Sequence, residues 1–450
     1  METAPLAADD PNVQLVIDVL PALLAILVVS ALCGRLFEKW GQPRVLGEMV
    51  AGILLGPTLL GRIAPDVQES LFSQDVKPVL YVLSTIGLTL FMFLVGLGLD
   101  HHAAPEGFKG TAGALAVSSI LPAILAGGCV GLVFYDSLSR ADVSPTMFAL
   151  FVGGALSVTA FPMLARIIYD SGLERSPLGV LALLTAAVDD AFAWCLLAFL
   201  VAFHQGGGLG ESVRTILLAA LFALAVMTLG RRGLSRIGDR VERTGELVGG
   251  QFCFIVVLVL GAGFFTEEIG VYAVFGGFMV GMAMPRSEIL QNALRDRLRD
   301  TVQILLVPIF FAFSGLNTQI SGFTDAATLV PLVALIVTAF IGKYVGCVGV
   351  MKARGFSWRE GSAMGSLMNA RGLMILVFIN VGLAQGIIGQ RAFSLLVLVA
   401  LVTTASALPL CKLSLGGTWP TQNEDGQNRA VTASVSAGTD SGVTERSASG

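Results

Sequence analysis

The sequence has 450 residues, of which 54% are hydrophobic and only 13% are charged, with a formal net charge of −4. Soluble domains carry about 25% charged residues, so this composition excludes a water-soluble globular protein. Unbroken apolar runs such as 216–229 and 392–408 are long enough, with their flanks, to cross about 30 Å of hydrocarbon as helices. A β-barrel would instead show segments of about ten alternating residues. The predicted fold is therefore an all-α polytopic membrane protein.

Apolar runs separated by charged, glycine or proline clusters predict about thirteen transmembrane helices. An acidic N-terminal segment, residues 1–12, precedes them and lacks the basic region of a cleaved signal peptide. Residues 286–301 predict a charged amphipathic helix along the cytoplasmic interface. The predicted spans are 13–36, 44–60, 78–100, 111–135, 145–170, 177–204, 211–231, 248–268, 270–285, 302–317, 326–351, 360–385 and 391–411.

The distribution of Lys and Arg tests this count, because cytoplasmic loops hold most of the basic residues. If the N-terminus is outside, the loops predicted to be cytoplasmic hold most of the Lys and Arg residues, including the cluster from Arg231 to Arg243. The alternation predicts a multi-pass protein of the plasma membrane with a cytoplasmic C-terminal tail, residues 412–450. That tail is polar and is expected to be disordered. The opposite loops hold only Arg62, Lys77, Arg140, Arg214 and Arg391.

Two pairs of similar segments suggest an internal repeat. LTLFMFLVGLGLD (88–100) resembles LVPIFFAFSGLNT (306–318), and GEMVAGILLGP (47–57) resembles VFGGFMVGMAMP (274–285). The expected arrangement is a first six-helix repeat over 13–204, a linker helix over 211–231, and a second, inverted repeat over 248–411. Inverted repeats are typical of secondary transporters, whose sites lie where the repeats meet. The alternative, that any two glycine-rich membrane helices look alike, stays open.

Four ionisable side chains lie deep inside predicted spans: Asp189 and Asp190 in the sixth, Lys343 in the eleventh and Arg371 in the twelfth. Each charge at mid-membrane costs about 2.5 to 3.5 kcal/mol on insertion scales, so such residues are candidates for function. Neighbours on a helix point about 100° apart, so the two carboxylates should have different roles. One can pair with Lys343 while the other faces a water-filled route. A purely structural ion pair with the lysine is the alternative.

A carboxyl group held away from water and beside a like charge takes up a proton more readily than a solvated one. One of the two aspartates could therefore exchange a proton for a cation at physiological pH. Competition between H⁺ and a cation for one site, together with alternating access, would give antiport without a catalyst or cofactor.

The fifth span, ALFVGGALSVTAFPMLARIIYD, contains two glycines and then Pro162, which lacks a backbone donor. An unwound stretch around Ser157 to Phe161 would offer carbonyl groups and the hydroxyls of Ser157 and Thr159 as cation ligands. Broken helices serve this purpose in transporters. A simple proline kink is the alternative.

The twelfth span carries a polar patch, Asn369, Ala370, Arg371 and Gly372, at the corresponding place of the second half. A second broken helix is expected there. Arg371 would then neutralise the carbonyl ends of half-helices, unless its side chain reaches to an interface instead.

Taken together, these segments resemble the monovalent cation:proton antiporter-2 family, which includes sodium/proton exchangers, Kef-type potassium efflux systems and plant cation/proton exchangers. The resemblance implies two repeats, two broken crossing helices in a core domain, and a homodimer. It also implies that Asp190 holds the exchanged Na⁺ or K⁺, that Asp189 pairs with Lys343, and that exchange is electrogenic. It is carried by PRVLGEMVAGILLGPTLLG (43–61), LFMFLVGLGLD (90–100), LSVTAFPMLARII (156–168), AAVDDAFAW (186–194), FIGKYVG (340–346) and NARGLMILVFINVGL (369–383).

Two other functions remain open at this point. A proton-independent cation channel can also be lined by acidic residues. An intramembrane aspartyl protease also uses two membrane aspartates, but adjacent residues on one helix cannot flank a peptide bond, and no GxGD motif is present. The six cysteines are scattered singly, which gives no support to a metal site or disulfide. We expect a transporter and not an enzyme, with the lipid bilayer and no nucleic acid as its surroundings.

Overall fold

The computed structural model describes residues 10–98, 108–140, 142–170, 173, 176–204, 208–318 and 325–416. Within these residues all regular structure is helical, which confirms the predicted all-α class. In this described part of the chain, eleven helices are long and apolar enough to cross a membrane, and two further apolar helices, over 273–283 and 374–384, are shorter. The count of thirteen spans stays a prediction. Residues 1–9 and 417–450 of the predicted terminal segments lie outside the described residues.

The described helices follow the predicted spans in chain order. They are α1 (Pro11–Lys39), α2 (Arg44–Leu55), α3 (Leu60–Ile63), α4 (Pro65–Leu71), α5 (Val76–Leu97), α6 (Phe108–Val133), α7 (Tyr135–Leu138), α8 (Pro145–Ser157), α9 (Phe161–Asp170), α10 (Pro177–His204), α11 (Gly208–Ala225), η1 (Val226–Gly230), α12 (Arg231–Thr244), α13 (Gly249–Glu268), α14 (Ala273–Ala283), α15 (Glu288–Asp300), η2 (Thr301–Leu306), α16 (Val307–Leu316), α17 (Ala326–Ala353), α18 (Trp358–Leu367), α19 (Gly372–Ala384) and α20 (Gln390–Ser414).

Two predicted spans are parts of longer helical runs. The helix of the seventh span, predicted over 211–231, continues beyond residue 231, because α11, the π-helical turn η1 and α12 form one helical run to Thr244. The predicted amphipathic helix over 286–301 is likewise joined to the tenth span through η2 without a loop. Charged residues end an apolar run, but they do not end a helix. The first run stops only at Gly245, whose φ of +75° is a left-handed cap that suits glycine.

Side-chain caps start several of the helices. The Ser144 hydroxyl accepts from the Met147 N–H at 3.3 Å, with Pro145 following it at the start of α8. Ser357 and Glu360 form a reciprocal capping box at α18, with bonds of 3.2 and 2.8 Å. These caps place the first turn of each half-helix that leads to the site described below.

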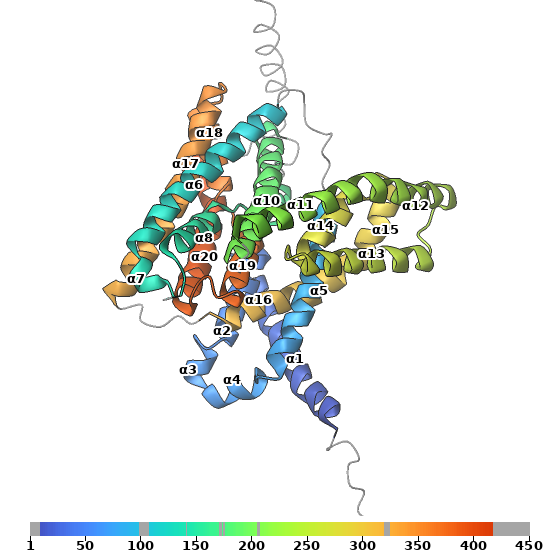
Figure 1. Cartoon of the computed structure of the whole chain (residues 1–450), viewed down its shortest axis with the longest axis horizontal. Helices are drawn as coiled ribbons and strands as arrows, with labels where there is room; N and C mark the ends of the chain where they lie inside the picture. The colour runs from blue at the N-terminus through green and yellow to red at the C-terminus, as the bar shows by residue number, and fades with distance from the viewer. Residues whose placement is uncertain are drawn as a thin grey trace, which may run out of the picture.

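Most helix contacts among the described residues fall within two groups. The core group contains α6, α8 to α10 and α17 to α20; the scaffold group contains α1 to α5 and α11 to α16. Figure 1 shows α6, α8, α17, α18 and α20 gathered on the left and α11 to α15 on the right, with α10, α16 and α19 between them.

The contacts in the scaffold group mirror each other between the halves of the chain. α2 packs on α16, and α5 packs on α14. A Cβ on Gly52 would collide with the Phe311 carbonyl, and one on Gly281 would collide with the Phe93 carbonyl. Small residues allow this close approach of membrane helices. The glycine-rich segments that suggest a repeat therefore pack on each other, which is the pairing that an inverted repeat would give; the repeat itself stays a prediction.

Candidate functional site

Two broken helices meet at the centre of the core group. Residues 158–160 are non-helical between α8 and α9, and 368–371 are non-helical or turn residues between α18 and α19. The Ala160 N–H donates to the Ala370 carbonyl at 3.0 Å, so the two breaks touch. The unwound stretch predicted around Ser157 to Phe161 is present. Pro162 lies in the first turn of α9, where a missing N–H costs little, so it does not kink a continuous helix.

Gly372 begins α19 with a φ of +47°. A residue with a side chain is strained in this conformation, and a Cβ here would also lie 2.8 Å from the Met163 Cβ on the other broken helix. Gly372 therefore allows the second break to approach the first.

Asp189, on α10, is buried and fully hydrogen-bonded. Its Oδ2 lies 3.1 Å from Lys343 Nζ, 2.8 Å from the Thr159 hydroxyl and 3.2 Å from the Ser119 hydroxyl. Lys343 is itself 0% exposed, so this is a buried ion pair of the kind that the resemblance implied. The Thr159 hydroxyl also accepts from Lys343 Nζ and has the Met368 carbonyl 3.0 Å away. Thr159 thus joins the ion pair to both breaks, and it contacts Asp189 instead of Asp190.

Asp190 is 0% exposed, and neither of its carboxylate oxygens has a hydrogen-bond partner among the described residues. An ionised carboxylate in such a place costs several kcal/mol. A buried Asp190 must therefore either carry a proton or hold a cation. The difference from Asp189 follows from their spacing of about 100° around α10, which turns only one of them toward Lys343.

Arg371 is 0% exposed and holds the end of α8. Its guanidinium donates to the carbonyl of Leu156, to that of Val158 at 3.3 Å, and to that of Ala339 on α17 at 2.7 Å. It therefore neutralises the carbonyl end of a half-helix, and the alternative of a side chain that reaches an interface is wrong. The expectation that carbonyls of the unwound stretch around Ser157 to Phe161 are free cation ligands is wrong for Val158, whose carbonyl accepts from the Arg371 guanidinium.

Two other predicted residues lie at the breaks without touching the aspartates. The Ser157 hydroxyl donates to the Gly154 carbonyl of its own helix at 2.8 Å. The Asn369 amide donates to the Gly365 carbonyl at 2.9 Å, while its buried Oδ1 has no partner among the described residues. The side chains of Ser157 and Asn369 therefore satisfy carbonyl groups at the C-terminal ends of α8 and α18.

Two residues of the site were not predicted from the sequence. Ser119 on α6 binds Asp189, and the Thr404 hydroxyl on α20 accepts from the backbone N–H groups of both Arg371 and Gly372, at 3.1 Å each. Hydroxyls in helices usually bond their own backbone, so sequence offers little signal for either contact. The only sequence signal for either residue is a polar side chain in the middle of an apolar span.

We expect Thr404→Val to destabilise the protein by about 1 to 3 kcal/mol, because two buried N–H groups lose their acceptor. Thr404→Ser keeps the hydroxyl and should behave as the wild type. Thermal unfolding of the purified protein in detergent measures the difference. Equal stability of the Val and Ser variants would show that the hydroxyl does not cap α19.

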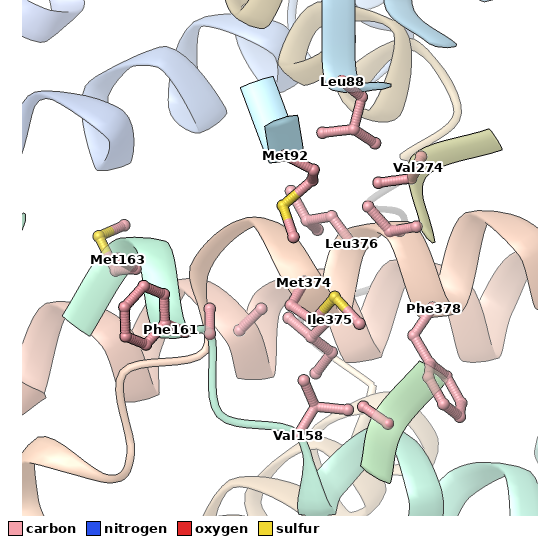
Figure 2. Close-up of a cluster of buried hydrophobic side chains, with 14 of the residues drawn as sticks. Leu88, Met92, Val158, Phe161, Met163, Val274, Met374, Ile375, Leu376 and Phe378 are labelled. Carbon is pink, nitrogen blue, oxygen red and sulfur yellow. The ribbon is translucent and has the colours of Figure 1, made fainter. Parts of the chain in front are cut away.

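A cavity of about 320 Å³ lies between the scaffold and core groups, lined by residues of α5, α14, α16 and α19, with Glu267 at the end of α13. Asp190 is not among its lining residues. Figure 2 shows an apolar cluster that runs from Leu88 and Val274, which line the cavity, to Val158 and Phe161 at the fifth-span break, with Met92 between them. Apolar side chains therefore stand between the cavity and the broken helices.

Comparisons with known proteins identify the family of this chain. The family described as "Sodium/hydrogen exchanger, transmembrane" matches residues 24–412. The Na⁺/H⁺ antiporter NhaS4 of Synechocystis sp. is 39% identical over 402 residues, covering 89% of this chain and 97% of that protein. Cation/H⁺ antiporter 20 of Arabidopsis thaliana is 35% identical over 85% of this chain and 47% of its own length, so this chain spans about half of that relative.

The fold also matches a solved structure. The sodium proton antiporter MjNhaP1 from Methanocaldococcus jannaschii superposes with a TM-score of 0.56 over 90% of this chain and 98% of that one. At 15% identity this likeness concerns the fold alone. Because the family matches most of the chain and a 39% identical relative matches it nearly end to end, this multi-pass membrane protein belongs to the sodium/hydrogen exchanger family.

Proposed function

We propose that this protein exchanges Na⁺ or K⁺ for protons across the plasma membrane by alternating access at Asp190. The observation that carries the proposal is the burial of Asp190 without a hydrogen-bond partner among the described residues, next to a second acid that is fully paired. Relatives named Na⁺/H⁺ and K⁺/H⁺ antiporters support the same class of activity. Membership of a transporter family removes the intramembrane protease as an alternative.

Exchange at Asp190 depends on the free-energy cost of burying an ionised carboxylate, which sets one rule for the site. The bare carboxylate is too costly to bury, so the site closes only when Asp190 is neutralised by H⁺ or by a cation. A cation that binds from one side displaces the proton, and a proton that binds from the other side displaces the cation. Passage of one ion in each direction follows from this rule, and a leak through the empty site is suppressed.

The moving unit in this proposal is the core group. Arg371 and Thr404 tie the two broken helices to α17 and α20, so the breaks, Asp189 and Asp190 travel as one body. The apolar cluster of Figure 2 separates the cavity from the two breaks in the present state. Movement of the core group along the scaffold would open one route and close the other. The outside N-terminus and the homodimer remain part of the proposal, since they rest on charge distribution and resemblance.

Electrogenic exchange requires a second proton-carrying group. The Lys343–Asp189 pair is the candidate, because it is buried beside the transported ion and shares the Thr159 hydroxyl with both breaks. Loss of the lysine proton when a cation arrives would make two protons move for each cation. A fixed pair would make the exchange electroneutral.

The test uses everted vesicles from cells that lack other cation/proton antiporters, with an interior acidified by respiration and followed by a pH-sensitive dye. Addition of Na⁺, K⁺ or Li⁺ should alkalinise the interior, and the three half-saturating concentrations give the selectivity. A channel would carry the cation without moving protons once the membrane potential is clamped. Absence of a pH response to all three cations would overturn the proposal.

A further inference from the structure

Four arginines form a stripe on α12, the helix that continues from α11 through η1. At 100° per residue, Arg232, Arg236, Arg240 and Arg243 fall within an arc of about 80° and extend over about 17 Å of helix. All four are exposed. The buried residues of the same helix, Leu234, Gly238 and Val241, lie on the opposite side.

The protein holds α12 by that buried side only. A Cβ on Gly238 would lie 2.8 Å from Pro285, so the helix is seated closely on the segment that leads into α15. This contact fixes the rotation of α12 and turns the arginine stripe away from the protein. In Figure 1, α12 lies at the right-hand edge of the molecule beside α15.

None of the four guanidinium groups forms an ion pair or hydrogen bond with another described residue. Asp239 lies on the same face of the helix as the stripe, but neither it nor Glu242 comes within salt-bridge distance of these arginines in the described part of the chain. Other arginines of this chain do have partners: Arg297 donates to the Leu247 carbonyl and stacks on Phe252. The stripe therefore consists of four arginines without a salt-bridge partner among the described residues, and with Asp239 on the same face its net charge is positive.

The stripe also begins where the lipid-facing part of the helix ends. In the apolar part of the helical run that contains α11, only 6% of the residues are buried by protein. Leu229, just before α12, is 67% exposed. About twenty residues of helix cross the hydrocarbon, so the residues after Leu229 reach the headgroup level. Arginine suits this place because its guanidinium binds phosphate with two parallel hydrogen bonds.

We propose that the arginine stripe of α12 binds the headgroups of anionic phospholipids in the leaflet that it faces. Lipid is the occupant because the stripe is the direct continuation of a helix surface that already faces lipid, and because its charge is opposite to that of the headgroup phosphates. The same charges would attract soluble phosphate only weakly, since nothing encloses it there. Bound lipid would hold α12, and through Pro285 the segment leading to α15, at the membrane surface.

The experiment compares thermal unfolding of the full-length protein in detergent with added phosphatidylglycerol, with added phosphatidylcholine, and with glycerophosphate. For the wild type we expect a midpoint several degrees higher with phosphatidylglycerol than with phosphatidylcholine. Arg236→Gln/Arg240→Gln should lose about half of this difference, because two of four charges are removed. Glycerophosphate at the same concentration should have no effect, which separates a membrane lipid from a free phosphate ester.

The matched control is Arg354→Gln/Arg359→Gln, which removes two exposed arginines that lie outside the stripe. It should keep the wild-type difference. An equal loss in both double variants would mean that only net charge matters and would overturn the proposal. So would a wild type that unfolds at the same temperature with both lipids. Cation-dependent proton movement in phosphatidylcholine liposomes should be the same for all three proteins, which reports on the exchange site separately.

Discussion

Asp190→Asn should abolish cation-dependent proton movement while the protein is still made and inserted in normal amounts. Asparagine has nearly the shape of aspartate, so the packing around α10 is kept. Its amide carries no negative charge and takes up no proton, so it can neither hold a cation nor exchange one. Asp190 has no side-chain hydrogen-bond partner among the described residues, and the Phe161 backbone N–H, which faces its carboxylate, can donate to the asparagine Oδ1 as well. The variant should be at least as stable as the wild type.

The measurement is the vesicle assay with Na⁺, K⁺ and Li⁺, alongside thermal unfolding of the purified variant. Glu268→Gln is the matched control: it removes an exposed carboxylate at the end of α13 and should leave exchange unchanged. Exchange by Asp190→Asn at more than about a tenth of the wild-type rate would refute the assignment, since a neutral side chain cannot lower the barrier for a buried cation to that extent. A variant that fails to insert would contradict the expectation of an unstrained, unpaired side chain.

The positions of the deepest polar residues could be predicted because the membrane makes them conspicuous. A charge in hydrocarbon is costly, so Asp189, Asp190, Lys343 and Arg371 stand out in a sequence that is otherwise apolar. The break at 158–160 was predictable from the residues on either side of it, since Gly153 and Gly154 before it and Pro162 after it weaken a continuous helix.

The partners of these residues could not be predicted from the chain alone. Spacing on α10 separates the two aspartates, but it does not say which one faces Lys343. The Val158 carbonyl was expected to be free for a cation, and only the tertiary position of Arg371 shows that it accepts a hydrogen bond. Thr404 lies 33 residues from Arg371 in sequence and carries no pattern that points there. The end of α12 was missed because hydropathy reports the edge of the bilayer and not the end of a helix.

Lys343→Met should strongly destabilise the protein. The Asp189 carboxylate would then be buried with only hydroxyl donors, Thr159 and Ser119, and an uncompensated buried charge costs about 3 to 5 kcal/mol. Asp189→Asn should have a similar effect, because it leaves the ammonium group of Lys343 unpaired. Protonation of Asp189, or loss of the lysine proton, limits the cost in each case.

The double variant Asp189→Asn/Lys343→Met carries no buried charge at this position and should recover most of the lost stability. The coupling between the two substitutions, measured from thermal or denaturant unfolding of all four proteins, isolates the interaction of the pair. The double variant should also keep exchange at Asp190 but become insensitive to the membrane potential, because no second proton carrier remains. Additive losses of stability would mean that the 3.1 Å contact contributes nothing, and potential-driven exchange by the double variant would place the second proton elsewhere.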